Sequence, residues 1–367
     1  MRNKFLIALI ISCSFTSLSS NGQDSIRTGS WLSVNVHYGI ILPVYTEGMN
    51  VLIKAHVPGV EGDYLLKPAG TEQWQNTYRC AETGIAFFYA WLGNPTQVGN
   101  EMGIYPFINF HLQRSYHEEL YLRTGIGLAY LPVTFNQQTN HKDILIGTHL
   151  NTMINVRLTN HYYLTDKLRL ETGFGITHCS NGSFKTPNLG INLITVNTGL
   201  SYCIDNSKAV CPKPVIDTIN HKTLSHEFFV AGGVSETEPP GGKQFGAATV
   251  SYTLYHTINY KSKIGGGIDV FYNAANQNQY WVDTIHHLSE LQNIQVGLKA
   301  AYELVIGHLA MPMELGGYVY TNSTGHGYEY NRIGLRYYTN HHFIINVSLL
   351  AHFASADFVE WGIGYKL

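Results

Sequence analysis

Hydrophobic and polar residues alternate along most of the chain with a period of two, and helical periodicity is nearly absent. Successive side chains of a β-strand point to opposite faces, so this alternation predicts strands with one apolar and one polar face. In the segment 168–180, for example, Leu170 and Ile176 lie on one face, whereas Arg169 and Glu171 lie on the other. The chain is therefore predicted to be all-β.

Comparable alternation recurs in the segments 119–128, 149–158, 249–259, 295–304, 345–349 and 359–365. Many of these strands extend over about 10–14 residues, which is longer than strands of soluble sheets and close to what a tilted strand needs to cross a bilayer. A closed barrel also leaves no unpaired strand edge in the lipid. We therefore predict an antiparallel transmembrane outer-membrane β-barrel with roughly 12–16 strands.

The composition agrees with a membrane barrel. Only 13% of the 367 residues are charged, and the chain contains 25 Tyr and 36 Gly. These values are typical of a barrel that is apolar outside and polar inside. The net charge of -2 disfavours nucleic acid as a partner, because a phosphate backbone selects for a basic surface.

The N-terminus has the pattern of an export signal. Arg2 and Lys4 precede a short apolar run, 5–11, and a Ser-rich tail follows. We predict a secretory signal peptide over residues 1–23, and hence export, which for a transmembrane barrel of this kind means the cell outer membrane. Cys13 lies in a sequence that loosely resembles a lipoprotein box, which leaves lipidation as an alternative.

Four cysteines remain after such a cleavage, and export permits disulfides. They are Cys80, Cys179, Cys203 and Cys211. Four cysteines allow three pairings, and the sequence does not choose among them. The pair Cys203–Cys211 is the most plausible local one, and free, buried cysteines are the alternative.

A polar, proline-bearing stretch, 205–223, divides the strand-rich segments 24–204 and 224–367. We interpret it as a linker between two halves that each supply about eight strands. One large barrel and two small barrels both satisfy that count. Because strands continue to the last residue, a single closed barrel is the preferred expectation.

Candidate chemistry lies at the end of one predicted strand. His178 and Ser180 share the parity of the apolar residues of segment 168–180, so both face the lipid. Asn192 has the same orientation in the next strand. Polar groups on the outside of a barrel are costly to desolvate, so their placement requires a reason, such as a membrane lipid as substrate.

The residue types predict a serine hydrolase site. Ser180 would be the nucleophile, His178 its general base, and Asn192 would hold the imidazole tautomer. Asn181 and a backbone N–H of the turn at Gly182 would form an oxyanion hole. The loop over the site would be shaped by Gly182, Pro187 and Gly190. No metal or cofactor is expected.

The motifs HCSNG and PNLGIN, at 178–182 and 187–192, resemble those of the PagL-type lipid A 3-O-deacylases, acyloxyacyl hydrolase-like barrels of Gram-negative outer membranes. In that family, a His and a Ser two positions apart form a triad with a Glu fourteen positions after the His. The matching positions are His178, Ser180, Asn181, Pro187, Asn188 and Gly190. The Glu position holds Asn192 instead. The known enzymes are eight-stranded barrels, so the resemblance leaves 224–367 unexplained.

The resemblance implies an esterase that removes an ester-linked 3-hydroxyacyl chain from lipid A, with lipopolysaccharide as its partner. Asn192 is expected to weaken the enzyme, because an amide orients a histidine but supplies no negative charge to the imidazolium. The long connections 132–143 and 181–191 suit the outer side of the membrane. The alternatives are a non-catalytic lipopolysaccharide-binding barrel, a pore, and an outer-membrane phospholipase. The oligomeric state is left open.

Overall fold

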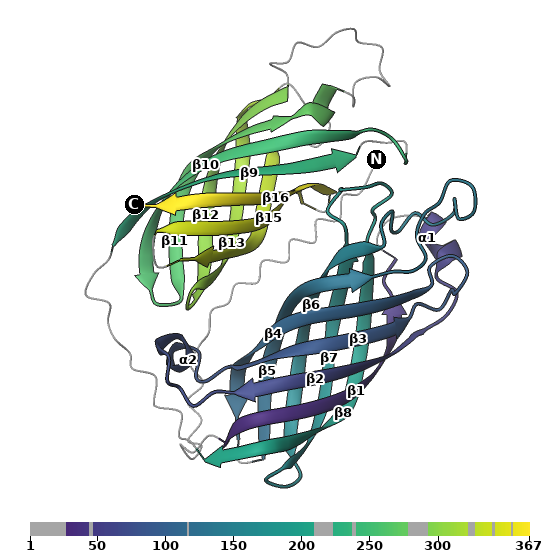
Figure 1. Cartoon of the computed structure of the whole chain (residues 1–367), viewed down its shortest axis with the longest axis vertical. Coiled ribbons are helices and arrows are strands. Elements are labelled where there is room, and N and C mark those ends of the chain that lie inside the picture. The colour runs from purple at the N-terminus through teal and green to yellow at the C-terminus, as the bar shows by residue number, and fades with distance from the viewer. Residues whose placement is uncertain are drawn as a thin grey trace, which may run out of the picture.

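The computed structural model describes residues 27–43, 47–115, 117–208, 223–236, 240–277, 293–321, 327–339, 342–353 and 355–367. The expected signal peptide, Cys13, Cys211 and most of the expected linker lie outside these residues. The described part contains sixteen β-strands and only short helices (Figure 1). No helix among the described residues is long and apolar enough to cross a membrane.

The first eight strands form one closed antiparallel barrel, here the N-terminal barrel. Its strands are β1 (Arg27–Ile41), β2 (Val57–Lys67), β3 (Glu82–Trp91), β4 (Asn100–Arg114), β5 (Glu118–Tyr130), β6 (Leu150–Tyr163), β7 (Leu168–Ser180) and β8 (Ile191–Lys208). Two short helices, α1 (Glu47–Leu52) and α2 (Gln73–Thr77), lie in the β1–β2 and β2–β3 connections. The barrel closes because β1 pairs with β8 along nearly its whole length.

The last eight strands form a second closed barrel, here the C-terminal barrel. Its elements are β9 (Leu224–Glu236), β10 (Gln244–Asn259), β11 (Ser262–Asn273), the 3-10 turn η1 (Ala274–Gln277), β12 (Ile294–Ile306), β13 (Leu309–Tyr320), β14 (Glu329–Tyr338), β15 (Phe343–His352) and β16 (Ser355–Lys366). It closes through pairing of β16 with β9.

The preference for a single barrel is therefore wrong, although the strand number falls within the predicted range. Both arrangements have the same alternation and the same strand count. They differ in whether β8 pairs with β1 or with β9. The pairing of these strand edges depends on tertiary structure, which the alternation pattern does not predict.

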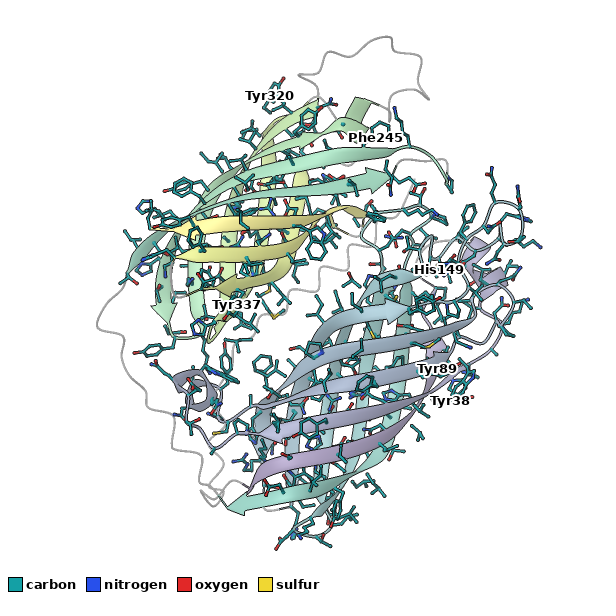
Figure 2. The ribbon with its side chains drawn as sticks, viewed as in Figure 1. Tyr38, Tyr89, His149, Phe245, Tyr320 and Tyr337 are labelled. Carbon is teal, nitrogen blue, oxygen red and sulfur yellow. The ribbon has the colours of Figure 1, made fainter. Side chains whose placement is uncertain are left out.

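The outer faces of both barrels are apolar and exposed, as the alternation predicts. In β1, Val34 is 67% exposed, whereas its neighbours Ser33 and Asn35 are buried inside the barrel. Aromatic side chains lie near the barrel ends, among them Tyr38, Tyr89, His149, Phe245, Tyr320 and Tyr337 (Figure 2). An apolar outer surface with aromatic residues near its ends is what a membrane barrel requires.

Buried charges fill the interior of the N-terminal barrel. Glu61 accepts hydrogen bonds from Arg157 at 2.6 Å and Arg123 at 3.1 Å, and Arg169 donates to Glu82 at 2.9 Å. All five of these side chains are almost inaccessible to water. Each charge is therefore stabilised by an opposite charge rather than by solvent.

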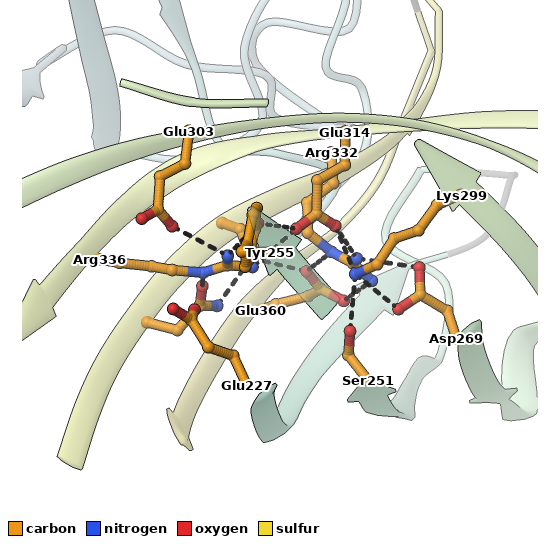
Figure 3. Close-up of polar contacts among 12 residues, drawn as sticks. Glu227, Ser251, Tyr255, Asp269, Lys299, Glu303, Glu314, Arg332, Arg336 and Glu360 are labelled. Atoms are coloured by element: carbon orange, nitrogen blue, oxygen red, sulfur yellow. Dashed lines mark hydrogen bonds and ion pairs between the residues drawn. The ribbon is translucent and has the colours of Figure 1, made fainter. Parts of the chain in front are cut away.

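The C-terminal barrel has a comparable network centred on Arg332 (Figure 3). Arg332 contacts Glu360 at 2.6 Å, Glu314 at 2.5 Å and Asp269 at 3.1 Å. Lys299 contacts the same Glu314 and Asp269, at 2.8 and 3.1 Å. The network connects strands that are distant around the wall and leaves these side chains buried.

The proposed pair Cys203–Cys211 is wrong, because Cys203 is a free thiol. Its Sγ donates to the carbonyl oxygen of Asp205 at 3.3 Å. Cys179 is also free and is buried inside the barrel, as its parity predicts. Cys80, in contrast, is disulfide-bonded. Alternation indicates which face a cysteine occupies but not its distance from another sulfur.

We expect Arg332→Ala to lower the free energy of unfolding by about 3–5 kcal/mol, because it leaves three buried carboxylates without their shared cation. The measurement is urea unfolding of the purified protein in lipid vesicles. Lys243→Ala, at an exposed cation of the same barrel, is the matched control and should change stability by less than about 0.5 kcal/mol. Equal effects of the two substitutions would contradict the central role of Arg332.

Candidate active site

Strands β7 and β8 bring the three candidate residues together. His178 lies directly opposite Asn192 in the strand register, and Ser180 lies two residues further along β7. His178 Nδ1 is 2.8 Å from Asn192 Oδ1, and His178 Nε2 is 2.9 Å from Ser180 Oγ. All three side chains are half-buried on the outer face, whereas Cys179 between them points inward.

These contacts determine the proton positions. An amide oxygen only accepts hydrogen bonds, so the Nδ1–H of His178 must donate to Asn192. The neutral ring then has an unprotonated Nε2, which accepts the Ser180 hydroxyl proton. This is the tautomer that a general base needs in order to activate a serine.

The loop after β7, residues 181–190, is here the active-site loop. The Asn181 backbone N–H donates to Asn188 Oδ1 at 3.0 Å. Its side-chain amide donates to Lys185 O at 2.8 Å and Thr148 Oγ1 at 3.1 Å. The donors of Asn181 are thus engaged within the protein. Gly182 is buried, and its N–H donates to no acceptor among the described residues.

Gly190 and Gly182 both have positive φ, +75° and +61°, a conformation that favours glycine. Gly190 also passes close to His178, since a Cβ at this position would lie 3.0 Å from His178 Cε1. Pro187 is buried, and the Asn188 side chain is the acceptor for Asn181. These residues therefore contribute to the way in which this loop folds back toward His178.

The β5–β6 connection, residues 131–149, supports this loop. Leu145 O accepts the Gly190 N–H at 3.0 Å, and Thr148 accepts from Asn181. Burial of Asp143 raises the pKa of its carboxyl to about 6. The folded connection therefore binds the Asp143 carboxyl proton more tightly than an unfolded chain does. The stability of the folded connection should fall as the pH rises from about 4 to about 6. No sequence motif indicated these residues, since they carry out backbone support rather than chemistry.

Comparison with family models identifies the chain. Residues 59–201 match the model "Lipid A 3-O-deacylase (PagL)", and residues 224–367 match "Acyloxyacyl hydrolase, C-terminal domain". The chain belongs to the PagL family of lipid A 3-O-deacylases. The two matched segments correspond to the two barrels, so the family extends over both.

Membership has consequences for fold and activity. PagL proteins are outer-membrane β-barrels, which agrees with the exposed apolar walls of this chain. At the level of the family, the activity is hydrolysis of ester bonds in lipid A, with lipopolysaccharide as the partner. The resemblance in the sequence motif is thereby confirmed as a family relationship.

Other comparisons add little. No curated protein matches the chain. Among solved structures, a triple mutant and two further mutants of the Rhodopseudomonas blastica porin are similar at 8%, 8% and 10% identity. The matches cover 93% of this chain and 100% of the porin chains, with TM-scores of 0.17, 0.19 and 0.18. At these TM-scores, the likeness carries no argument about this chain.

We expect Gly190→Ala to reduce the rate of ester hydrolysis at least about tenfold, because the new methyl group displaces the His178 ring from Ser180. Gly327→Ala is the matched control. Gly327 also has positive φ, +94°, but among the described residues a Cβ there would meet only Glu329 Oε2, at 3.5 Å. Both variants carry the backbone strain, so the difference in rate reports the contact with His178. Equal rates would contradict it.

Proposed function

We propose that this protein is an outer-membrane serine esterase that removes an ester-linked 3-hydroxyacyl chain from lipid A. The observation that carries the proposal is the continuous hydrogen-bonded series Asn192–His178–Ser180 on the outer face of the N-terminal barrel. A hydrolase of water-soluble substrates would have no use for a site on this face. A lipid in the same membrane reaches it by lateral diffusion.

In the proposed first step, Ser180 Oγ attacks the ester carbonyl while its proton passes to His178 Nε2. The carbonyl oxygen becomes an oxyanion, for which the Gly182 N–H, unpaired among the described residues, would be the donor. The tetrahedral intermediate collapses, the sugar oxygen leaves with the proton from His178, and the acyl group stays on Ser180. Water, deprotonated by the same His178, then releases the 3-hydroxy fatty acid and restores Ser180.

PagL enzymes have a carboxylate at the position of Asn192, and Asn192 would supply one of its two functions. Its Oδ1 holds the Nδ1–H and so selects the tautomer, but its neutral amide does not compensate the imidazolium that forms after proton transfer. We therefore propose a working but slowed triad. Residues 24–204 would form the catalytic unit, preceded by the signal peptide.

The surroundings suit an acyl chain. Phe174 and Ile176 lie on the same face of β7 as His178, and each is about half exposed to the lipid. Val196 extends this apolar surface on β8. A bound lipid could therefore keep its chains against the wall while its ester reaches Ser180. The long connections at this end of the barrel support placement in the outer leaflet, where lipid A resides.

The packed interiors disfavour the pore alternative. An open channel would leave lumen-facing side chains accessible to water, yet the charged residues that line both barrels are buried. A phospholipase would use the same triad on a different ester. A lipopolysaccharide-binding barrel would retain the triad without turnover. The reaction product distinguishes the lipid A deacylase from the phospholipase and from the non-catalytic binding barrel.

The first test is mass spectrometry of lipid A from cells that express the wild type or Ser180→Ala. We expect loss of one 3-hydroxyacyl chain with the wild type and a rate at least about 1,000-fold lower with Ser180→Ala, because the nucleophile is removed. Thr172→Ala, on the same face of β7, is the matched control and should leave the rate unchanged. Unaltered lipid A with the folded wild type would refute the deacylase, and altered phospholipids instead would establish the phospholipase.

The second test isolates the missing charge. Asn192→Asp keeps the shape of the side chain and adds a carboxylate, so kcat should rise at least about tenfold. The acidic limb of the pH–rate profile should also move to higher pH, because the carboxylate stabilises the protonated His178. Asn192→Leu removes the acceptor and should lower kcat below that of the wild type. If the Asn192→Asp variant were no faster than the wild type, the proposed role of this position would be wrong.

A further inference from the structure

The active-site loop does not face lipid on all sides, because its first half contacts the C-terminal barrel. Ser183 Oγ donates to Ala356 O at 2.7 Å, and the Glu236 backbone N–H donates to Ser183 O at 3.1 Å. In Figure 1, the start of β16 lies beside the end of the N-terminal barrel that carries this loop. The hydroxyl group and the carbonyl oxygen of Ser183 thus both attach the loop to the second barrel.

Two side chains extend the contact. Thr186 Oγ1 donates to Glu236 Oε1 at 3.3 Å, and Gln244 Nε2 donates to Phe184 O at 2.9 Å. Glu236 Oε1 also accepts the Gly241 N–H at 2.8 Å, which fixes the carboxylate within its own barrel. Glu236 is only 5% exposed, so the two hydrogen bonds to its carboxylate are partly shielded from water, whereas the Gln244 hydrogen bond is exposed.

An apolar contact accompanies the polar ones. A Cβ on Gly182 would clash with Val359 Cγ2 and lie 3.2 Å from Leu349 Cδ1. These two residues belong to the outer face of the C-terminal barrel and are partly covered, whereas Ile363 further along the same face is 70% exposed. The backbone of Gly182, two residues after Ser180, therefore rests directly on the second barrel.

The loop conformation itself needs such support. Ser183 has φ +64°, in the left-handed region that costs a non-glycine residue roughly 1 kcal/mol. It adjoins Gly182, whose N–H is the proposed oxyanion donor. A strained residue next to a catalytic group persists only where its surroundings determine its conformation, and here the surroundings belong to the other barrel.

We propose that the C-terminal barrel holds residues 182–186 in the conformation needed for ester hydrolysis, with Ser183, Thr186 and Glu236 as positioning residues. The proposal rests on the proposed function, because it assigns the second barrel to the same site. It gives the second barrel a role in transition-state stabilisation without contact with the substrate. Weakening the contact should then lower kcat and leave KM nearly unchanged.

The test compares the full-length double variant Ser183→Ala/Glu236→Ala with the wild type on purified lipid A in detergent. We expect kcat to fall about 10–100-fold with KM within about threefold, since a displaced donor affects the transition state more than binding. Hydrogen exchange of residues 182–186 should accelerate in parallel. The conservative variant Glu236→Gln, which keeps the Oε1 acceptor, should retain the wild-type kcat.

Tyr78→Phe is the matched control for the contact between barrels. Tyr78 follows α2 at the opposite end of the N-terminal barrel, and its hydroxyl donates to Val305 O in the C-terminal barrel at 2.7 Å. Its loss removes a hydrogen bond between the barrels without touching the active-site loop, so kcat should stay within about twofold of the wild type. A large fall in kcat with Tyr78→Phe would contradict a role confined to the loop.

The outcomes separate the two proposals. If the wild type hydrolyses lipid A and the double variant keeps either its kcat or its loop protection, the positioning role is overturned. If the wild type shows no hydrolysis but the double variant loses loop protection, the contact between loop and barrel stands and the proposed function fails. Should the double variant not fold, Thr186→Val removes a single hydroxyl of the same contact and decides by the same two measurements.

Discussion

The structure depends on closure of each sheet in a medium without water. Hydrocarbon offers no partner for a backbone N–H or C=O, so every strand edge in the membrane must be paired. Pairing of β1 with β8 and of β9 with β16 achieves this twice. Closure also fixes the sidedness of every strand, because one face must contact lipid and the other must fill a narrow interior.

This sidedness explains why polar groups are expected inside the barrels and why polar groups on the outer face require a separate explanation. Inside, charges such as Arg332 and Glu360 lie within hydrogen-bonding distance and satisfy each other without solvent. Outside, the polar series of His178, Ser180 and Asn192 satisfies itself in the same way. A polar series on the lipid side has no structural task in the barrel wall. This is why its presence there points to chemistry on a lipid.

The second barrel gives the chain a feature that a single eight-stranded barrel lacks. The active-site loop is hydrogen-bonded to the β5–β6 connection, through Leu145 and Thr148. It is also hydrogen-bonded to the C-terminal barrel, through Glu236 and Ala356. A loop that bears the proposed oxyanion donor must be rigid for that donor to stabilise a transition state. Support from two directions supplies that rigidity outside the close-packed interior.

The sequence by itself determined the strands, their sidedness and the motif, because period-two alternation records which face each residue occupies. It therefore placed His178 and Ser180 outward and Cys179 inward, and predicted Asn192 beside them. It did not determine which strand edges close, which cysteine is bonded, or that Gly182 rests on Val359. Those outcomes depend on pairs of residues far apart in the chain, and only the tertiary structure brings their atoms within contact distance.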